Sequence, residues 1–230
     1  MKAVLLEISG NWAQFRRAET NSNPLSHDII TKTAFIGMVG AVLGIRRTEM
    51  KNHFPKWCRD FLYGVQILND VNKQSWGFTF RYTSEYWRKS PGQMEFIRNP
   101  KYRVLFALLN QESENYFDDF ANYCKNGESH YEPVLGLHNC PAEITFIKEG
   151  EVSMIDNAEF ETLGFVTNQH TLSDNAQIPM RLGFDNIPVH QNDDFWNNEF
   201  QSVIYPSAGN KISVVGKHFE FNDNSKWCLI

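Results

Sequence analysis

The chain has 230 residues, of which 42% are hydrophobic and 21% are charged. This composition is typical of a globular protein that is large enough to bury a substantial core. No run of about 20 apolar residues occurs, which excludes a membrane-spanning helix. Glu7 interrupts the apolar N-terminal stretch too early for a signal peptide. We therefore expect a cytoplasmic protein that makes no membrane contact.

Charge is distributed unevenly along the chain, whose net charge is −5. Residues 1–103 hold 16 lysines and arginines against 8 acidic residues, a net charge of +8. Residues 104–230 hold 6 against 19, a net charge of −13. Such asymmetry indicates that the first part meets a polyanion. The alternative is ordinary variation of surface charge.

The four cysteines are far apart and form no Cys-x-x-Cys pair: Cys58, Cys124, Cys140 and Cys228. We expect reduced thiols, as is usual in the cytoplasm. His130, His138 and Cys140 do not match the ligand spacing of a zinc site. The sequence therefore predicts no metal and no other cofactor.

The first predicted elements are a strand and a helix joined by a long loop. Residues 3–8 carry apolar side chains on both faces, which predicts a central strand. Residues 10–30 are rich in Asn, Ser, Gly and Pro and predict a loop. Residues 31–45 predict a helix that Thr31 or Thr33 caps.

Three glycines recur at helical spacing in that helix, and Ala41 adds to the smooth stripe formed by Gly37, Gly40 and Gly44. Each interior glycine costs about 1 kcal/mol relative to alanine. We expect another backbone to approach the stripe closely, either a sheet beneath it or a nucleic acid above it, and packing alone is the more common cause.

Residues 48–61 predict a helix broken near Pro55, and residues 63–68 and 76–82 predict strands. The second strand places Trp76, Phe78, Phe80 and Tyr82 on one face. An aromatic strand face can stack nucleic-acid bases. A hairpin that buries its aromatic side chains is the interpretation we favour.

Further along, residues 94–97 and 102–108 predict strands on either side of a basic turn at 98–101, and residues 114–125 predict an amphipathic helix. Beyond residue 131 we expect short strands at 144–148, 152–155, 163–167, 203–205 and 212–221, with a mobile loop at 168–177. The order of elements predicts an α+β fold. Residues 1–150 would form a ferredoxin-like (RRM-like) domain with an inserted β-hairpin near 63–90, and residues 151–230 a small β-rich C-terminal extension.

Three stretches of the sequence carry a family resemblance when they are taken together. They are residues 10–17 (GNWAQFRR), residues 31–45 (TKTAFIGMVGAVLGI), and residues 93–103 (QMEFIRNPKYR) paired with 131–137 (YEPVLGL). In this order and spacing they resemble the Cas-five family of repeat-associated RNA-binding proteins, most closely its type I-B branch. The resemblance covers about the first 150 residues.

The resemblance implies a subunit of a CRISPR–Cas Cascade complex whose β-hairpin serves as a thumb. In that family the subunit grips the 5′ handle of the CRISPR RNA and caps a filament of Cas-seven-type subunits. It also contacts a Cas-eight-type large subunit, and meets target DNA only through the complex. The thumb displaces a base near the junction of handle and spacer.

A bent single strand requires fixed cations and backbone N–H donors, which the N-terminal half can supply. The candidate RNA-binding residues are Trp12, Phe15, Arg16, Arg17, Thr31, Lys32, Thr33, Arg46, Arg47, Arg98, Lys101 and Arg103. For each cation the alternative is an ordinary solvated charge. Arg46 and Arg47 could equally balance a helix dipole, and Trp12 and Phe15 could belong to the core.

Two other functions stay open. Relatives of the type I-C branch cut precursor CRISPR RNA without metal, by means of a Tyr, Lys and His constellation. The basic region 98–103 has no histidine, and Lys217 with His218 does not fall where the family places its Lys–His pair. We therefore expect no catalytic residues. The remaining alternative is a protein–protein scaffold without RNA contact, which the acidic second half would suit.

Overall fold

The computed structural model describes residues 1–230 except 21, 82, 86, 174–180 and 192–197. Its main sheet is built around β1 (Lys2–Ser9), which lies between β6 (Lys101–Leu108) and β7 (Glu143–Thr162) and is antiparallel to both. Val4 and Leu6 belong to the larger core cluster, whereas Ala3 and Leu5 belong to a second cluster. The predicted central strand, apolar on both faces, is confirmed.

The sheet continues on both sides in the order β13-β12-β7-β1-β6-β3. Its outer strands are β3 (Phe61–Ile67), β12 (Ile212–Phe221) and β13 (Lys226–Trp227), and the short β9 (Thr171–Leu172) pairs with β12. The two strands predicted at 144–148 and 152–155 are one strand, β7, which runs through residue 150. The free edge of β3 is covered because Tyr63 and Ile230 exchange backbone hydrogen bonds.

The helices are α1 (Lys32–Val42), α2 (Arg47–Asp60) and α3 (Glu114–Asn126), which follows a short 3-10 turn, η1 (Gln111–Ser113). Thr31 caps α1, because its hydroxyl accepts a hydrogen bond from Ala34 N. The predicted break near Pro55 is wrong. α2 continues through the proline, and its buried Phe54 and Trp57 pack into the core on either side. None of the described helices is long and apolar enough to cross a membrane.

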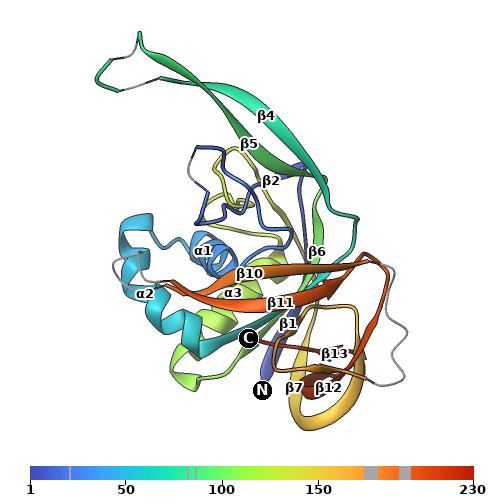
Figure 1. The fold of residues 1–230 in the computed structure, drawn as a ribbon. Coiled ribbons are helices and arrows are strands. Elements are labelled where there is room, and N and C mark those ends of the chain that lie inside the picture. The colour runs from blue at the N-terminus through green and yellow to red at the C-terminus, as the bar shows by residue number, and fades with distance from the viewer. Residues whose placement is uncertain (21, 82, 86, 174–180, 192–197) are drawn as a thin grey trace.

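A long hairpin projects from the body of the molecule (Figure 1). It consists of β4 (Asn72–Arg81) and β5 (Lys89–Arg98), and β2 (Trp12–Ala13) extends it to a three-stranded sheet. The hairpin therefore spans 72–98 rather than 63–90, because residues 63–67 belong to β3. At its base the rings of Trp12 and Trp76 meet edge to face, with centroids 4.7 Å apart.

The hairpin buries its aromatic side chains only in part. Trp76 is 39% exposed, and Phe78 is half-buried with its ring 6.4 Å from that of Phe96. The prediction for the side chains of Phe80 and Tyr82 lies outside the described residues.

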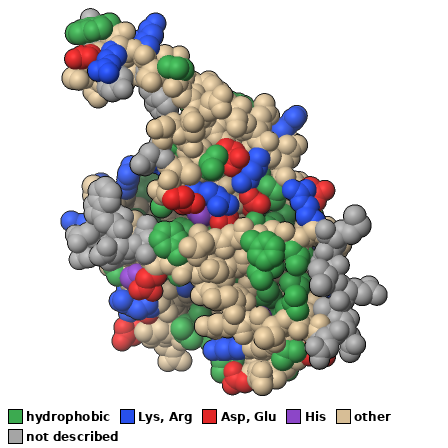
Figure 2. Space-filling model, viewed as in Figure 1, with side chains coloured by type: hydrophobic (Ala, Val, Ile, Leu, Met, Phe, Trp, Pro, Cys, Tyr) green, Lys and Arg blue, Asp and Glu red, His purple; other side chains and the backbone are tan. Residues whose placement is uncertain are grey.

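A third sheet combines β8 (Val166–Thr167), β10 (Leu182–Gln191) and β11 (Asn198–Pro206) in the order β10-β11-β8. β10, which the sequence did not predict, contacts both α1 and α2 (Figure 1). Figure 2 shows hydrophobic side chains over this sheet, and Phe184 is among the most exposed of them. Of the loop predicted at 168–177, residues 168–173 include β9, and the remainder lies outside the described residues.

Candidate nucleic-acid interface

The three stretches that carry the family resemblance meet in the folded chain. Residues 10–12 lie beside the basic turn at 98–101: Gly10 N donates to Pro100 O at 3.2 Å, and Asn99 N donates to Asn11 O at 2.9 Å. The left-handed Asn99, with φ of 48°, forms the corner of that turn. The first and third stretches are therefore one structural unit, although about 85 residues separate them in the sequence.

Residues 131–137 join this unit to the glycine-containing helix. Tyr131 N donates to Ala41 O, and Gln14 N donates to Leu135 O, and each N···O distance is 3.0 Å. Gly136 has φ of 91°, and a Cβ there would overlap with Gln14 O, so only glycine fits this crossing. The segment thus connects the end of α1 with residues 10–15.

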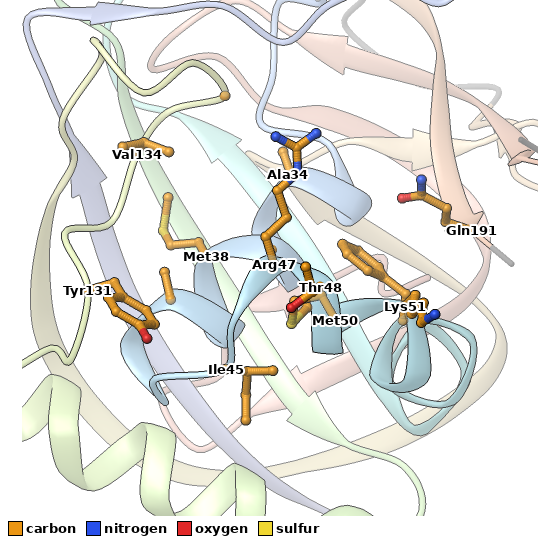
Figure 3. A pocket seen from close by; sticks show the side chains of 14 residues that line it. Ala34, Met38, Ile45, Arg47, Thr48, Met50, Lys51, Tyr131, Val134 and Gln191 are labelled. Atoms are coloured by element: carbon orange, nitrogen blue, oxygen red, sulfur yellow. The ribbon is translucent and has the colours of Figure 1, made fainter. Parts of the chain in front are cut away.

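A groove of about 830 Å³ opens between α1, α2 and residues 131–136 (Figure 3). This volume lies within the range of about 300–1,000 Å³ that is common for small-molecule sites. Tyr131 and Val134 stand at one end and Gln191 at the other, with Met38 and Arg47 between them. Its other lining residues are Ala34, Gly37, Ala41, Ile45, Thr48, Met50, Lys51, Phe54 and Gly136.

The charges at the groove are of one sign. Arg47 and Lys51 stand one helical turn apart on α2, and both are exposed. Among the described residues neither forms an ion pair, and no acidic side chain lines the groove. Glu49 lies between them in the sequence, but its side chain accepts a hydrogen bond from Arg46 N at the start of the helix. Lys51 was not among the predicted site residues.

The glycine stripe predicted on α1 is corrected in part. Gly40 lies against α2, where a Cβ would overlap with Sδ of the buried Met50 side chain. The close neighbour is thus a side chain of a second helix, not a sheet or a nucleic-acid backbone. Gly44 lies beyond the helix end in a left-handed turn, with φ of 77°.

Gly37 differs from Gly40 because nothing in the described chain requires it. A Cβ at Gly37 would meet only Phe54 Cζ at 3.8 Å, an ordinary contact, and the position lines the groove. A glycine inside a helix costs about 1 kcal/mol relative to alanine. Packing within the described chain does not explain that cost.

Arg17 belongs to a buried network instead of an open surface. Its Nη2 donates to Asp185 Oδ2 at 3.1 Å, and His27 Nδ1 donates to Asp185 Oδ1 at 2.9 Å. Burial raises the pKa of Asp185, but the hydrogen bond from His27 and the charges of His27 and Arg17 outweigh it and lower that pKa. Arg16 is exposed, and its guanidinium donates to Thr20 O at 3.1 Å.

A second set of ion pairs lies at the base of the hairpin. Lys73 Nζ on β4 lies 2.6 Å from Asp28 Oδ1 and 3.0 Å from Glu95 Oε1 on β5. Tyr205 on β11 donates to the other carboxylate oxygen of Asp28, at 2.8 Å. These contacts join the hairpin to the loop before α1 and to the third sheet.

The third predicted basic cluster is also largely compensated. Lys101 Nζ lies 2.5 Å from Glu7 Oε1, and Arg103 Nη2 lies 3.6 Å from Glu7 Oε2. Arg98 is exposed at the end of β5, where it pairs in register with Trp12. Two of the three cations in this cluster therefore share one acid on β1.

The N-terminus of α1 does not face solvent as predicted. Thr31 and Lys32 are 3% and 4% exposed, because β10 packs across α1 and α2, and Thr33 is half-buried. Burial lowers the pKa of Lys32 to about 8, although the neighbouring Cys58 opposes this shift. In the described part of the chain the ammonium group of Lys32 has no ion pair. The predicted phosphate site at this helix end is thus covered.

The two aromatic candidates have different environments. Trp12 is half-buried and packs against Trp76 and Phe96 at the hairpin base. Phe15 is 3% exposed and packs against Tyr102, with centroids 6.2 Å apart. Phe15 is therefore a core residue, and its ring is not accessible to a base.

The cysteines and His218 lie in the interior of the described chain. All four cysteines are free and buried. The described residues hold no group of three or more His, Cys, Asp or Glu side chains that could bind a metal ion. Lys217 is exposed, whereas His218 is 1% exposed and stacks on Phe160 with centroids 4.2 Å apart. The two neighbours do not share a site.

Comparison with known proteins gives consistent results. The family model described as CRISPR-associated protein (Cas_Cas5) matches residues 3–198. No curated protein matches the chain. A CRISPR protein from Archaeoglobus fulgidus has a similar structure, with a TM-score of 0.62 and 15% identity over 99% of this chain and 98% of that one.

Two further similar structures belong to complexes. One is a chain of a CRISPR RNA-guided surveillance complex, with a TM-score of 0.53 and 9% identity over 97% of this chain and 92% of that one. The other comes from a type III-B Cmr-beta complex bound to cognate target RNA, with a TM-score of 0.51 and 11% identity over 92% and 86%. At these identities the likeness shows a shared fold.

The match of the family model over most of the chain defines the class as CRISPR-associated proteins. Within that class the chain belongs to the Cas-five family.

Proposed function

We propose that the chain is a non-catalytic subunit of a type I, I-B-like, Cascade effector, and that it binds the 5′ handle of the CRISPR RNA. In that complex it caps a filament of Cas-seven-type subunits and contacts a Cas-eight-type large subunit. Target DNA is reached only through the complex. The observation that carries the proposal is the meeting of the three family stretches beside a groove whose charged side chains, among the described residues, are all cations.

The arrangement of strands supports the domain assignment. The four strands β7-β1-β6-β3 are antiparallel, with helices α1 and α3 in the intervening connections. That is the order of a ferredoxin-like unit. We assign residues 1–150 to this unit and residues 151–230 to the β-rich extension. The projecting β4–β5 hairpin, with Arg81 and Lys89 exposed near its tip, is the proposed thumb.

The proposal is tested by purifying the tagged full chain from cells that also express a CRISPR array and the other subunits. We expect a short RNA with one defined 5′ end to copurify, and its binding to weaken steeply as salt rises. Absence of RNA, or RNA with heterogeneous 5′ ends, would contradict handle binding. A scaffold without RNA contact would keep its protein partners after RNase treatment, and the chain purified alone would not bind a synthetic copy of the copurified RNA.

Cleavage is tested with the full chain purified without the other subunits. Incubation of the chain with labelled repeat RNA is expected to leave the RNA intact. Metal-independent cuts at one position would support the nuclease alternative, and their loss in His218→Ala would assign them to that histidine. Burial of His218 against Phe160 argues against such a role, since a general base must reach the 2′-hydroxyl.

A further inference from the structure

The groove between α1, α2 and residues 131–136 combines three properties that the described part of the chain does not use. Most of its lining is apolar and includes Met38 and Ala41 of α1. Tyr131 stands on one side (Figure 3). Tyr131 is 40% exposed even though its backbone is fixed to α1. Arg47 and Lys51 stand at the opening without acidic partners among the described residues.

Gly37 indicates where an occupant would come closest. The position has room for a side chain, and alanine would favour the helix more than glycine does. Gly40, one turn away, is explained by Met50, whereas no described neighbour explains Gly37. A glycine kept at the floor of an open groove leaves space for a flat group that approaches the helix backbone.

The choice of occupant follows from charge and shape. A buried apolar protein side chain would fill the floor but would leave two cations without partners. A nucleotide satisfies both parts, because its base is flat and apolar on its faces and its phosphate is anionic. Aromatic rings such as that of Tyr131 are common stacking partners for unpaired bases.

We propose that this groove holds a single flipped-out nucleotide of the bound RNA, with its base over Gly37 beside Tyr131 and its phosphate between Arg47 and Lys51. The inference rests on the proposed function and adds to it which surface grips the strand. It also places the RNA-binding surface in the open groove between α1 and α2 instead of at the covered N-terminus of α1.

The test uses a synthetic, labelled copy of the RNA that copurifies with the full chain. Gly37→Leu fills the floor of the groove with a side chain that suits a helix. We expect its dissociation constant for this RNA to rise at least tenfold. Asn122→Leu adds the same side chain to an exposed position on α3 and is expected to stay within twofold of wild type.

An abasic series locates the base. RNA copies that lack one base at a time are titrated against wild type and Gly37→Leu. We expect one position at which base removal weakens binding to wild type but not to Gly37→Leu, because the two changes remove the same contact. Gly37→Ala, which keeps the helix intact, provides the same comparison with a smaller change if the leucine variant folds poorly.

The outcomes separate this inference from the proposed function. If no RNA copurifies, the proposed function fails and the inference with it. If RNA binds but both Gly37 variants bind it as wild type does, or no abasic position couples to Gly37, only the inference is overturned. If Gly37→Leu binds RNA normally but no longer assembles with the other subunits, the groove takes a protein side chain and the inference is equally wrong.

Discussion

The hairpin base and the α1–α2 groove both carry cations, but only the cations at the hairpin base are paired with acids among the described residues. At the hairpin base Lys73 contacts two carboxylates, and Arg17 contacts the fully buried Asp185. At the groove Arg47 and Lys51 have no acidic partner in the described part of the chain. A cation that is already paired has less to offer a phosphate, so the groove is the stronger candidate for binding RNA even though the hairpin base is also rich in cations.

The acids that create this difference come partly from the second half of the chain. Asp185 neutralises Arg17, and Glu112 and Asp118 pair with Lys56 and Lys2. Ion pairs between the two parts of the chain therefore neutralise some of the excess cations of residues 1–103 and some of the excess acids of residues 104–230. On the basic side, the described cations without an acidic partner include Arg47 and Lys51 of α2.

The largest effect is expected when the shared acid, Asp185, is removed from the buried network, because this directly tests whether the paired cations at the hairpin base are structural. In Asp185→Ala, His27 and Arg17 no longer share an acceptor while His27 stays buried. Removing one partner of a buried ion pair typically costs about 3–5 kcal/mol. We expect a decrease of that size in the free energy of unfolding, measured by urea denaturation. The exposed Asp156→Ala is the control, and an equal effect in both variants would show that the network is not structural.

Lys32 gives the second largest effect, because its ammonium group is buried without an acid among the described residues. The folded pKa is about 8 and the ordinary value is 10.5. Between these values the unfolded chain binds more protons, so the penalty for Lys32 is complete below about pH 8 and declines as pH rises. Lys32→Met is expected to raise the free energy of unfolding at pH 7 by about 3 kcal/mol.

The advantage of Lys32→Met should shrink between about pH 8 and 9. Cys58 complicates higher pH, since burial raises the pKa of its thiol above the ordinary 9.0. Urea denaturation of both proteins at about pH 7, 8 and 9 checks the trend. If Lys32→Met were instead less stable than wild type by an amount that stays constant from about pH 7 to 9, the ammonium group would be stabilised in the folded chain by an anionic partner.

Local patterns predicted the elements that depend on neighbouring residues. The strand at 3–8, the cap at Thr31 and the amphipathic helix at 114–125 all appear, because alternation, capping and helical periodicity can be read within a short segment. Pro55 misled the prediction of α2. There the burial of one helix face outweighs the local penalty of a proline.

The site was harder to predict because it is assembled from distant parts. The sequence indicated Arg47 but not Lys51 or Tyr131 as binding residues, and it placed the RNA at the N-terminus of α1, which β10 covers. No pattern within residues 1–103 shows that Asp185 will neutralise Arg17. Such pairings depend on how the third sheet packs against the loop before α1, which no local pattern encodes.

The dependence of RNA affinity on salt concentration distinguishes the paired cations from the unpaired ones. Arg47→Ala with Lys51→Ala is expected to weaken binding of the copurified RNA about tenfold, which is about 1.4 kcal/mol. The slope of log affinity against log salt should fall by about 0.7 for each phosphate that is no longer neutralised. Lys101→Ala with Arg103→Ala should weaken binding less, because Glu7 already holds both cations. Fluorescence anisotropy at several salt concentrations measures all three proteins.

A matched control keeps net charge out of this result. Lys217→Ala with Lys226→Ala removes the same charge from β12 and β13, away from the groove, and neither lysine forms an ion pair among the described residues. If this pair lowered affinity and slope as much as the groove pair, the protein would bind RNA through its overall charge instead of a defined surface.

Gly37→Ala has the smallest expected effect on stability. It adds a single methyl group, whose effects on stability and on RNA affinity are expected to have opposite signs. Because its Cβ would meet only Phe54 at 3.8 Å, the helix should gain up to about 1 kcal/mol in the free energy of unfolding. For a chain of this size that is a rise of about 2–4 °C in the melting temperature. The same variant should bind RNA more weakly, since the methyl group occupies the floor of the groove. A variant that melts higher yet grips its ligand less well would mean that this glycine serves the ligand and not the fold. A lower melting temperature in Gly37→Ala would instead mean that Gly37, like Gly40, is required by packing within the protein.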